Sequence, residues 1–325
     1  MKKNLSPIGP FILTCALLFT VPVPVFAEGE SIPVETGSPE GIGTPAMDYS
    51  LEEYAAENDT DISSTDAEDS EETEAYIPDE LESAGGSDPN EILTPEDDDY
   101  KTIVGTDDRI IISDPSRYPY SAIAYMDVHA RCGCTWTGTG FMVGPSGMLT
   151  ASHCLVCTQH GQTADIIDYY FGLQPNGSYY YKYSNEFTYW YGTNFSVGDG
   201  TYGYTDQNME WDYGYIKLQE RVGDTTGWFG LSAKDDFTLD GSYYEVAGYR
   251  DWQLKSDINL LTVSNSNLVT HLADTQPGNS GGPIFDFDNY AVAINVAENN
   301  TLSYNVGRRI TSSLINEMRS HGLFE

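Results

Sequence analysis

The sequence predicts an all-β protein with one α-helix near its C-terminus. Segments of alternating or apolar residues are short, and Gly, Pro, Asn and Ser separate them at close intervals. The only convincing helical periodicity lies at the end of the chain, where Ile310, Leu314, Ile315 and Met318 share one face. Many short strands followed by one late helix predict an antiparallel barrel or sandwich, and periodicity does not choose between these two. The predicted strands are Tyr120–Met126, Phe141–Val143, Met148–Ala151, Trp211–Leu218, Tyr243–Ala247, Asn259–Val263, Asn267–Leu272 and Tyr290–Val296.

The N-terminus has the features of a secretory signal peptide. Two lysines follow Met1, an apolar run extends from about residue 8 to residue 26, and the small residues Val25 and Ala27 precede a polar switch at Glu28. A membrane anchor is the competing interpretation, but the prolines at positions 22 and 24 favour cleavage. No later stretch approaches the roughly 20 apolar residues of a membrane span. We therefore expect residues 1–27 to be removed and the mature protein to be secreted, without a membrane anchor.

An acidic segment follows the signal peptide. The formal net charge is −35, and 25 of the 50 acidic residues lie between Glu28 and Tyr100, where there is no Lys or Arg. Such a segment buries too little apolar surface to offset its ordering entropy. We predict a largely disordered prosegment over residues 28–101, with a solvating linker as the alternative role. An activating protease is expected to cleave after Lys101, which leaves a domain of residues 102–325. The acidic chain argues against nucleic acid as a partner.

A serine framed by glycines is the first candidate for chemistry. Ser280 lies in the stretch Asp274–Pro283, and an apolar run follows directly. Glycines allow a tight turn, in which the amides of Gly278 and Ser280 would converge beside the serine hydroxyl as an oxyanion hole. An ordinary hairpin turn would have the same composition. A base and an orienting acid elsewhere in the chain decide between the two interpretations.

A histidine and an aspartate complete a candidate triad. His153 comes directly after the predicted strand Met148–Ala151, which would hold it at a strand end, and Asp212 lies between Trp211 and Tyr213 at the start of another strand. Histidine can take the serine proton, and a carboxylate fixes its tautomer. The other histidines are less suited, because His129, His160 and His321 lie in polar or terminal segments and His271 is predicted to be structural. The order His, Asp, Ser is that of chymotrypsin-like enzymes.

From Ile103 to the C-terminal helix, the chain resembles the bacterial glutamyl endopeptidases, a secreted branch of the chymotrypsin-like serine proteases. The resemblance implies two six-stranded antiparallel barrels with the triad His153, Asp212 and Ser280 in the cleft between them. It also implies a zymogen prosegment, an N-terminus that helps to build the specificity pocket, and protein or peptide substrates. We expect no cofactor, no metal and a monomer. The segments that carry the resemblance are Val104–Arg109, Tyr118–Tyr120, Thr150–Cys154, Asp212–Leu218, Gly227–Gly230, Gly278–Pro283 and Ser303–Gly307.

The predicted S1 pocket departs from the family pattern. In that family, a Thr or Ser five residues before the nucleophile and a His fifteen residues after it bind the carboxylate of the P1 side chain. Thr275 matches the first position, but Asn295 replaces the histidine. A neutral amide donates hydrogen bonds to a carboxylate without the positive charge of a protonated histidine. The sequence therefore leaves acidic and neutral polar P1 residues open.

Four cysteines remain after signal cleavage: Cys132, Cys134, Cys154 and Cys157. A secreted chain favours disulfides, and we predict Cys134–Cys154 and Cys132–Cys157, which would tie down the loop that carries His153. In the relatives, a single bridge to the cysteine after the catalytic histidine is common, with its partner nearer the strand of Gly138 and Gly140. A zinc site of four cysteines is the alternative, since the spacing C-x-C and C-x-x-C suits a metal.

Two other functions compete with proteolysis. A catalytically silent protease homologue would act as a secreted or surface binding protein, but such proteins usually lack a member of the triad, and His153, Asp212 and Ser280 are all present. A secreted esterase would more often carry its serine in Gly-x-Ser-x-Gly and in the order Ser, Asp, His. The order found here disfavours the esterase.

Overall fold

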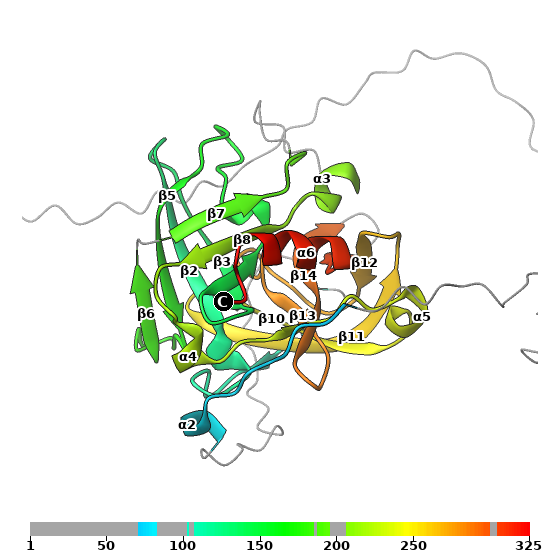
Figure 1. Cartoon of the computed structure of the whole chain (residues 1–325), viewed down its shortest axis with the longest axis horizontal. Coiled ribbons are helices and arrows are strands. Elements are labelled where there is room, and N and C mark those ends of the chain that lie inside the picture. Colours follow the sequence, from blue (N-terminus) through cyan, green and yellow to red (C-terminus); the bar gives the residue numbers. More distant parts are fainter. Residues whose placement is uncertain (1–70, 83–102, 104–106, 185–186, 196–205, 300–303) are drawn as a thin grey trace, which may run out of the picture. The chain divides into compact units, whose positions relative to one another are not determined.

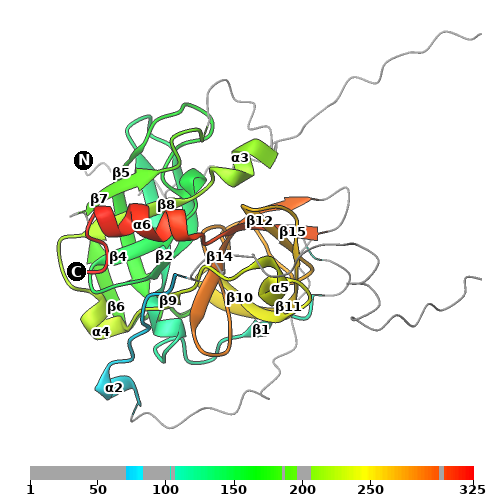
Figure 2. The ribbon, with the colours of Figure 1, turned by 45° about the vertical axis from the view of Figure 1, so that its right-hand side comes forward.

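The computed structural model describes residues 71–82, 103, 107–184, 187–195, 206–299 and 304–325. The predicted signal peptide, most of the predicted prosegment and the expected cleavage site at Lys101 lie outside the described residues. Two antiparallel sheets make up most of the described part (Figures 1 and 2). No helix in this part of the chain has the length and apolarity needed to cross a membrane.

The N-terminal half forms a curled sheet of seven strands in the order β6-β5-β2-β3-β4-β8-β7. Its long strands β2 and β3 form a hairpin in which Ile123 lies opposite Phe141. Among the described residues, the edge strands β6 and β7 do not pair with one another, so this sheet stays open. Its strands are β2 (Ile123–Ala130), β3 (Thr135–Met142), β4 (Gly147–Thr150), β5 (Ala164–Phe171), β6 (Tyr181–Ser184), β7 (Phe187–Tyr191) and β8 (Gly214–Leu218).

The C-terminal half forms a closed barrel. Six strands follow one another in the order β11-β10-β13-β14-β15-β12, and pairing of β12 with β11 closes the ring. The short strands β1 (Ile110–Ile111) and β9 (Gly230–Leu231) add to β11 and β14 at the outside. The barrel strands are β10 (Tyr243–Arg250), β11 (Gln253–Val263), β12 (Leu268–His271), β13 (Pro283–Phe285), β14 (Tyr290–Asn299) and β15 (Tyr304–Arg309).

Short helices connect the strands, and one longer helix ends the chain. Helix α6 (Ser312–Ser320) begins at Thr311, whose side chain accepts a hydrogen bond from the Leu314 amide, and it buries Leu314, Ile315 and Met318 as its periodicity predicts. The shorter helices are α2 (Asp79–Glu82), α3 (Asp206–Glu210), α4 (Gly223–Thr226) and α5 (Asp236–Leu239), with 3₁₀ turns η2 (Tyr120–Ala122) and η3 (Ser152–Cys154).

The predicted all-β architecture is confirmed, with three differences. The first sheet is curled and open rather than a closed six-stranded barrel. Tyr120 belongs to a 3₁₀ turn, and the adjoining strand begins at Ile123. Strands β5 to β7 form in a Tyr-rich region for which the sequence predicts no strand boundaries. Many of their side chains are only partly buried, so apolar alternation is weak there.

One hydrophobic core joins the two halves. It contains Met126 and Phe141 from the curled sheet together with Tyr249 and Ile294 from the barrel. A second, smaller core fills the barrel alone and includes Val246 and Ile284. The shared core holds the two sheets in a fixed relation, so residues at their junction are positioned by both.

Part of the predicted prosegment is ordered. Residues 71–82 run past β9 (Figure 2), where Thr73 N–H donates to Leu231 O at 2.9 Å and its hydroxyl accepts from Leu231 N–H. Tyr76 exchanges two backbone hydrogen bonds with Trp228 and stacks on its indole with ring centroids 4.3 Å apart. Glu71 pairs with Arg319 on α6. The expectation of general disorder is therefore wrong for this piece, because its backbone finds a strand edge to pair with.

We expect Tyr76→Ala to lower the free energy of unfolding of the full chain by about 1–3 kcal/mol, because it removes a stacked, partly buried ring. Urea denaturation of a Ser280→Ala background measures this. The control Phe237→Ala removes an aromatic ring that is 93% exposed and should change stability little. Equal effects of the two substitutions would show that the contact with Trp228 does not hold in solution.

Candidate active site

The turn that carries Ser280 lies at the junction of the two sheets. It directly precedes β13 of the barrel, and two hydrogen bonds tie it to β3 of the curled sheet. Thr139 N–H donates to Ser280 O at 2.8 Å, and the Thr139 hydroxyl donates to Gly278 O at 2.7 Å. The same hydroxyl accepts a bond from Tyr249 N–H of β10 at 2.9 Å. Thr139 thus joins the serine turn to both sheets.

The conformation of this turn requires glycine. Gly278 has φ +107° and Gly281 has φ +86°, and a Cβ at Gly281 would lie 2.1 Å from Thr139 O. The amides of Asn279, Gly281 and Gly282 all donate to protein carbonyls. Within the described part of the chain, the amides of Gly278 and Ser280 donate to no protein group. These are the two donors that the sequence predicts for an oxyanion hole.

His153 and Asp212 meet as the sequence predicts. His153 lies in η3, and Asp212 directly precedes β8. The His153 Nδ1 lies 2.6 Å from Asp212 Oδ2, and the His153 amide donates to Asp212 Oδ1 at 3.0 Å. The Asp212 side chain is fully buried, whereas that of His153 is 16% exposed. This geometry fixes the tautomer of the imidazole, because the Nδ1 proton is directed to the carboxylate.

The neighbour of His153 contacts the serine turn. The Cys154 thiol donates to Ser280 O at 3.4 Å, so the 3₁₀ turn with His153 and the turn with Ser280 are in direct contact. The Ser152 hydroxyl donates to Tyr213 O at 2.7 Å, which ties η3 to the segment with Asp212. The three predicted triad residues therefore come from two sheets and gather in one region.

The electrostatics suit an imidazole that is paired with an anion. Burial lowers the pKa of His153, but the Asp212 carboxylate, helped by the Cys154 thiol, raises it by more. The pKa of His153 therefore lies well above its ordinary value of about 6.5. A carboxylate that is fully buried against one imidazole has this effect because the low dielectric strengthens their attraction.

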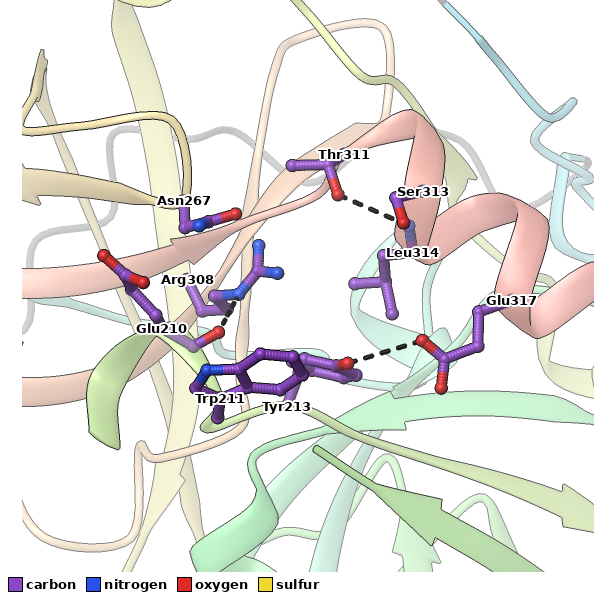
Figure 3. Close-up of a pocket in the computed structure, with 9 residues that line it drawn as sticks. All are labelled: Glu210, Trp211, Tyr213, Asn267, Arg308, Thr311, Ser313, Leu314 and Glu317. Carbon is purple, nitrogen blue, oxygen red and sulfur yellow. Dashed lines mark hydrogen bonds between the residues drawn. The ribbon is translucent and has the colours of Figure 1, made fainter. Parts of the chain in front are cut away.

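Aromatic residues on both sides of Asp212 line a small pocket of about 160 Å³ under α6 (Figure 3). The Tyr213 hydroxyl donates to Glu317 of α6 at 3.3 Å, and the Arg308 guanidinium lies 5.0 Å from the Tyr213 ring. Arg308 Nε donates to the backbone carbonyl of Glu210. The pocket is smaller than the roughly 300–1,000 Å³ of typical small-molecule sites. Its lining residues instead brace the segment that carries Asp212.

The chain upstream of β1 supports the loop before Ser280. Arg109 is buried, forms an ion pair with Asp107 at 2.6 Å and donates to Gln276 Oε1 at 2.7 Å. The Asp108 amide donates to Asp274 at 3.3 Å. The segment that follows the expected new N-terminus is therefore anchored beside the serine turn, although Thr102 itself lies outside the described residues.

The predicted S1 residues are both buried. Thr275 is 5% exposed in the loop before Ser280, and Asn295 is 3% exposed on β14. Asn295 joins the serine turn through its backbone, which accepts from Gly281 N–H at 2.8 Å, and through its amide group, which donates to Asn279 O at 3.4 Å. Asn295 therefore lies directly behind the turn with Ser280.

Sequence reasoning missed His271 as a neighbour of this site. His271 on β12 is 2% exposed, and burial lowers its pKa to about 4, against a smaller rise from the side chain of Asn295. In the described part of the chain, both His271 ring nitrogens and Asn295 Oδ1 lack a hydrogen-bond partner. The sequence offered only the histidine itself as a sign, because the residue pattern of β12 does not show that His271 faces Asn295.

The predicted disulfides are not formed in this structure, where all four thiols are free. Cys154 points to the serine turn and would lie 2.7 Å from a Cβ at Gly138. The family's bridge partner was expected near this strand, and a glycine stands there instead. The other three cysteines gather around His160, which the sequence analysis assigned to a polar loop.

Sequence comparison relates this chain to known peptidases. Residues 138–294 match the family of trypsin-like peptidase domains. The extracellular metalloprotease of Bacillus subtilis is 28% identical over 226 residues, which are 67% of this chain and 69% of that protein. The glutamyl endopeptidase of Bacillus licheniformis is 29% identical over 239 residues, which are 67% of this chain and 68% of that protein. The chain is thus related to trypsin-like peptidases.

Solved structures of proteases have a similar fold. A Glu endopeptidase superposes with a TM-score of 0.56 at 20% identity and covers 67% of this chain and 98% of its own. The protease Anisep from Arthrobacter nicotinovorans has a TM-score of 0.51 at 18% identity, with 62% and 94% covered. The fold is chymotrypsin-like, and the chain is distantly related to glutamyl endopeptidases and bacterial chymotrypsin-like proteases. The resemblance inferred from the sequence motifs is confirmed.

We expect NMR titration to give a His153 pKa above about 6.5, and Asp212→Asn to lower it to or below that value, because burial then acts without the carboxylate. A folded-state pKa above the unfolded value means that the pair stabilises the fold fully below about pH 6.5, and that this gain is lost as pH rises through the folded pKa. His153→Ala assigns the resonance, and all proteins carry Ser280→Ala. An unchanged pKa in Asp212→Asn would contradict the pairing.

Proposed function

We propose that the protein is a secreted serine endopeptidase. The observation that carries the proposal is the buried Asp212 bonded to His153 at 2.6 Å, beside a glycine turn whose Gly278 and Ser280 amides are unpaired among the described residues. The match of residues 138–294 to trypsin-like peptidase domains and the distant relation to a glutamyl endopeptidase support it.

In the proposed mechanism, Ser280 attacks the scissile carbonyl while His153 accepts its proton. Asp212 holds the imidazole in the required tautomer and stabilises the imidazolium, and the amides of Gly278 and Ser280 bind the oxyanion. His153 then protonates the leaving amine, the peptide bond breaks, and water hydrolyses the acyl-enzyme by the same route. The reaction needs no electron transfer and no group beyond these residues and water.

The proposed specificity follows from the residues behind the serine turn. Asn295 is neutral, and His271 with a pKa of about 4 is also neutral near pH 7, so neither supplies a positive charge to a P1 side chain. Their amide and imidazole groups can still donate or accept hydrogen bonds. We therefore propose an acidic or polar P1 residue, with Thr275 and Asn295 in the S1 pocket and modest discrimination between Glu and Gln.

Activation is proposed to require removal of the segment that ends near Lys101. The bonds from Arg109 to Gln276 and from the Asp108 amide to Asp274 support a role for the downstream chain in ordering the loop before Ser280. A new amine at Thr102 would lie only a few residues upstream of this anchor.

The function is tested with a P1-randomised peptide library and the secreted protein, whose expected first residue is Thr102. We expect cleavage by the native protein and a loss of at least about 10⁴-fold in Ser280→Ala, because the nucleophile is removed. Retained cleavage in that variant would favour metal-dependent hydrolysis, as the name of the Bacillus subtilis relative suggests. Silence of both folded proteins would favour a binding protein without catalysis.

Specificity is tested separately with Asn295→His. A histidine beside the P1 carboxylate adds positive charge when it is protonated, so kcat/KM for Glu relative to Gln should rise by about tenfold or more. The isosteric control Asn295→Asp adds negative charge instead and should lower the same ratio. A ratio that neither variant changes would show that position 295 does not line the pocket.

A further inference from the structure

Three cysteines and one histidine form a compact cluster beside the candidate active site. We call it the thiol–imidazole cluster, and its members are Cys132, Cys134, Cys157 and His160. Every pair of potential ligand atoms in it lies within 4.8 Å. The His160 Nδ1 is 3.4 Å from Cys134 Sγ and 3.6 Å from Cys157 Sγ.

The two nitrogen–sulfur separations match those around a tetrahedral zinc ion, and the remaining ligand atoms lie within 4.8 Å of one another. Zinc binds sulfur at about 2.3 Å and imidazole nitrogen at about 2.0–2.1 Å, so the tetrahedral angle places a sulfur and a nitrogen about 3.6 Å apart. The same geometry places two sulfurs about 3.8 Å apart. Three Cys and one His are also a common donor set of structural zinc sites. We propose that the thiol–imidazole cluster binds one zinc ion.

Two tight turns present the four ligands. Cys132 and Cys134 flank Gly133, whose φ is +83°, in the loop that joins β2 to β3. The first cysteine pair is held there because Ala130 N–H donates to Cys134 O at 3.0 Å and Gly133 N–H donates to Ala130 O at 2.9 Å. The backbone therefore fixes the C-x-C pair independently of any metal.

The second turn supplies the remaining two ligands. Cys157 and His160 are three residues apart in a hairpin that the bridge between Val156 and Thr163 closes. Gly161 N–H donates to Cys157 O at 2.8 Å, and Cys157 N–H donates to Gln162 O at 2.8 Å. Thus C-x-C and C-x-x-H elements from separate loops face one another, as in zinc sites that clamp two loops together.

The position of the cluster suggests what the metal does. Cys157 lies four residues after His153, which belongs to the turn η3. A zinc ion would fix the chain after His153 to the β2–β3 loop, where the disulfides predicted from the sequence would have acted. Four protein ligands leave no open position, so the role is structural and the metal takes no part in hydrolysis.

Metal analysis of the purified full chain tests the proposal. We expect one zinc per chain in native protein and in Ser280→Ala alike, so the result does not depend on whether the protein is a protease. Cobalt added to metal-free protein should give the intense visible absorption of a tetrahedral thiolate site. His160→Ala and Cys134→Ser should weaken zinc binding by at least about 100-fold, since even outer-shell partners of a metal contribute about 10- to 100-fold.

Matched controls separate metal binding from general damage. His129→Ala removes another half-exposed histidine, and Cys154→Ser removes the cysteine outside the cluster, and both should keep one zinc per chain. If a ligand variant does not fold, chelation of the folded native protein gives a second measurement: Tm should fall and return when zinc is restored. Unreduced protein with a disulfide among Cys132, Cys134 and Cys157 and no metal would overturn the proposal, as would equal zinc binding by His160→Ala.

Discussion

The hydrogen bonds of Thr139 are the interaction on which the arrangement of this molecule depends. Its amide and hydroxyl hold the backbone of the serine turn, while the same hydroxyl accepts from β10 and its carbonyl accepts from Thr150 on β4 at 2.7 Å. Because Thr139 is fully buried, each unmade bond would leave a desolvated polar group at a cost of about 1–3 kcal/mol. A shift of the turn with Ser280 would break these hydrogen bonds, so Thr139 ties the turn to both sheets.

The neighbourhood of the triad is reinforced in several independent ways. Asp212 is flanked by Trp211 and Tyr213, and the Tyr213 hydroxyl donates to Glu317 of α6. The turn with His153 is joined to the segment with Asp212 by Ser152 and to the serine turn by Cys154. The proposed zinc would add one more restraint on the same turn. A Cβ at Gly138 would lie 2.7 Å from Cys154 Sγ, so a larger residue there would crowd the Cys154 thiol.

Most of the fold could be predicted, and the residues proposed as a triad could be named, because local sequence patterns mark both. Strands β4, β8 and β10 are buried along most of their length and mostly apolar, so the sequence marks them. The partly exposed, Tyr-rich strands β5 to β7 were not delimited. His153, Asp212 and Ser280 have distinctive neighbours in sequence, and the structure brings His153 and Asp212 into contact. The disulfide expectation followed from compartment and spacing, which do not tell which cysteines meet. Segment 71–82 was expected to lack structure because its acidic composition gives no sign that its backbone can pair with the edge of a distant strand.

The sequence by itself determined the class of protein: strand periodicity, a late amphipathic helix, a glycine-framed serine and the order of His, Asp and Ser are all local or ordinal features. The tertiary structure alone decided which distant side chains share a site. It placed His271 against Asn295, separated Cys154 from the other cysteines, and brought His160 to Cys132, Cys134 and Cys157. The physical reason is that such contacts depend on loop conformation and strand register. These bring together side chains that are tens of residues apart in sequence, and they produce no periodic pattern of residues.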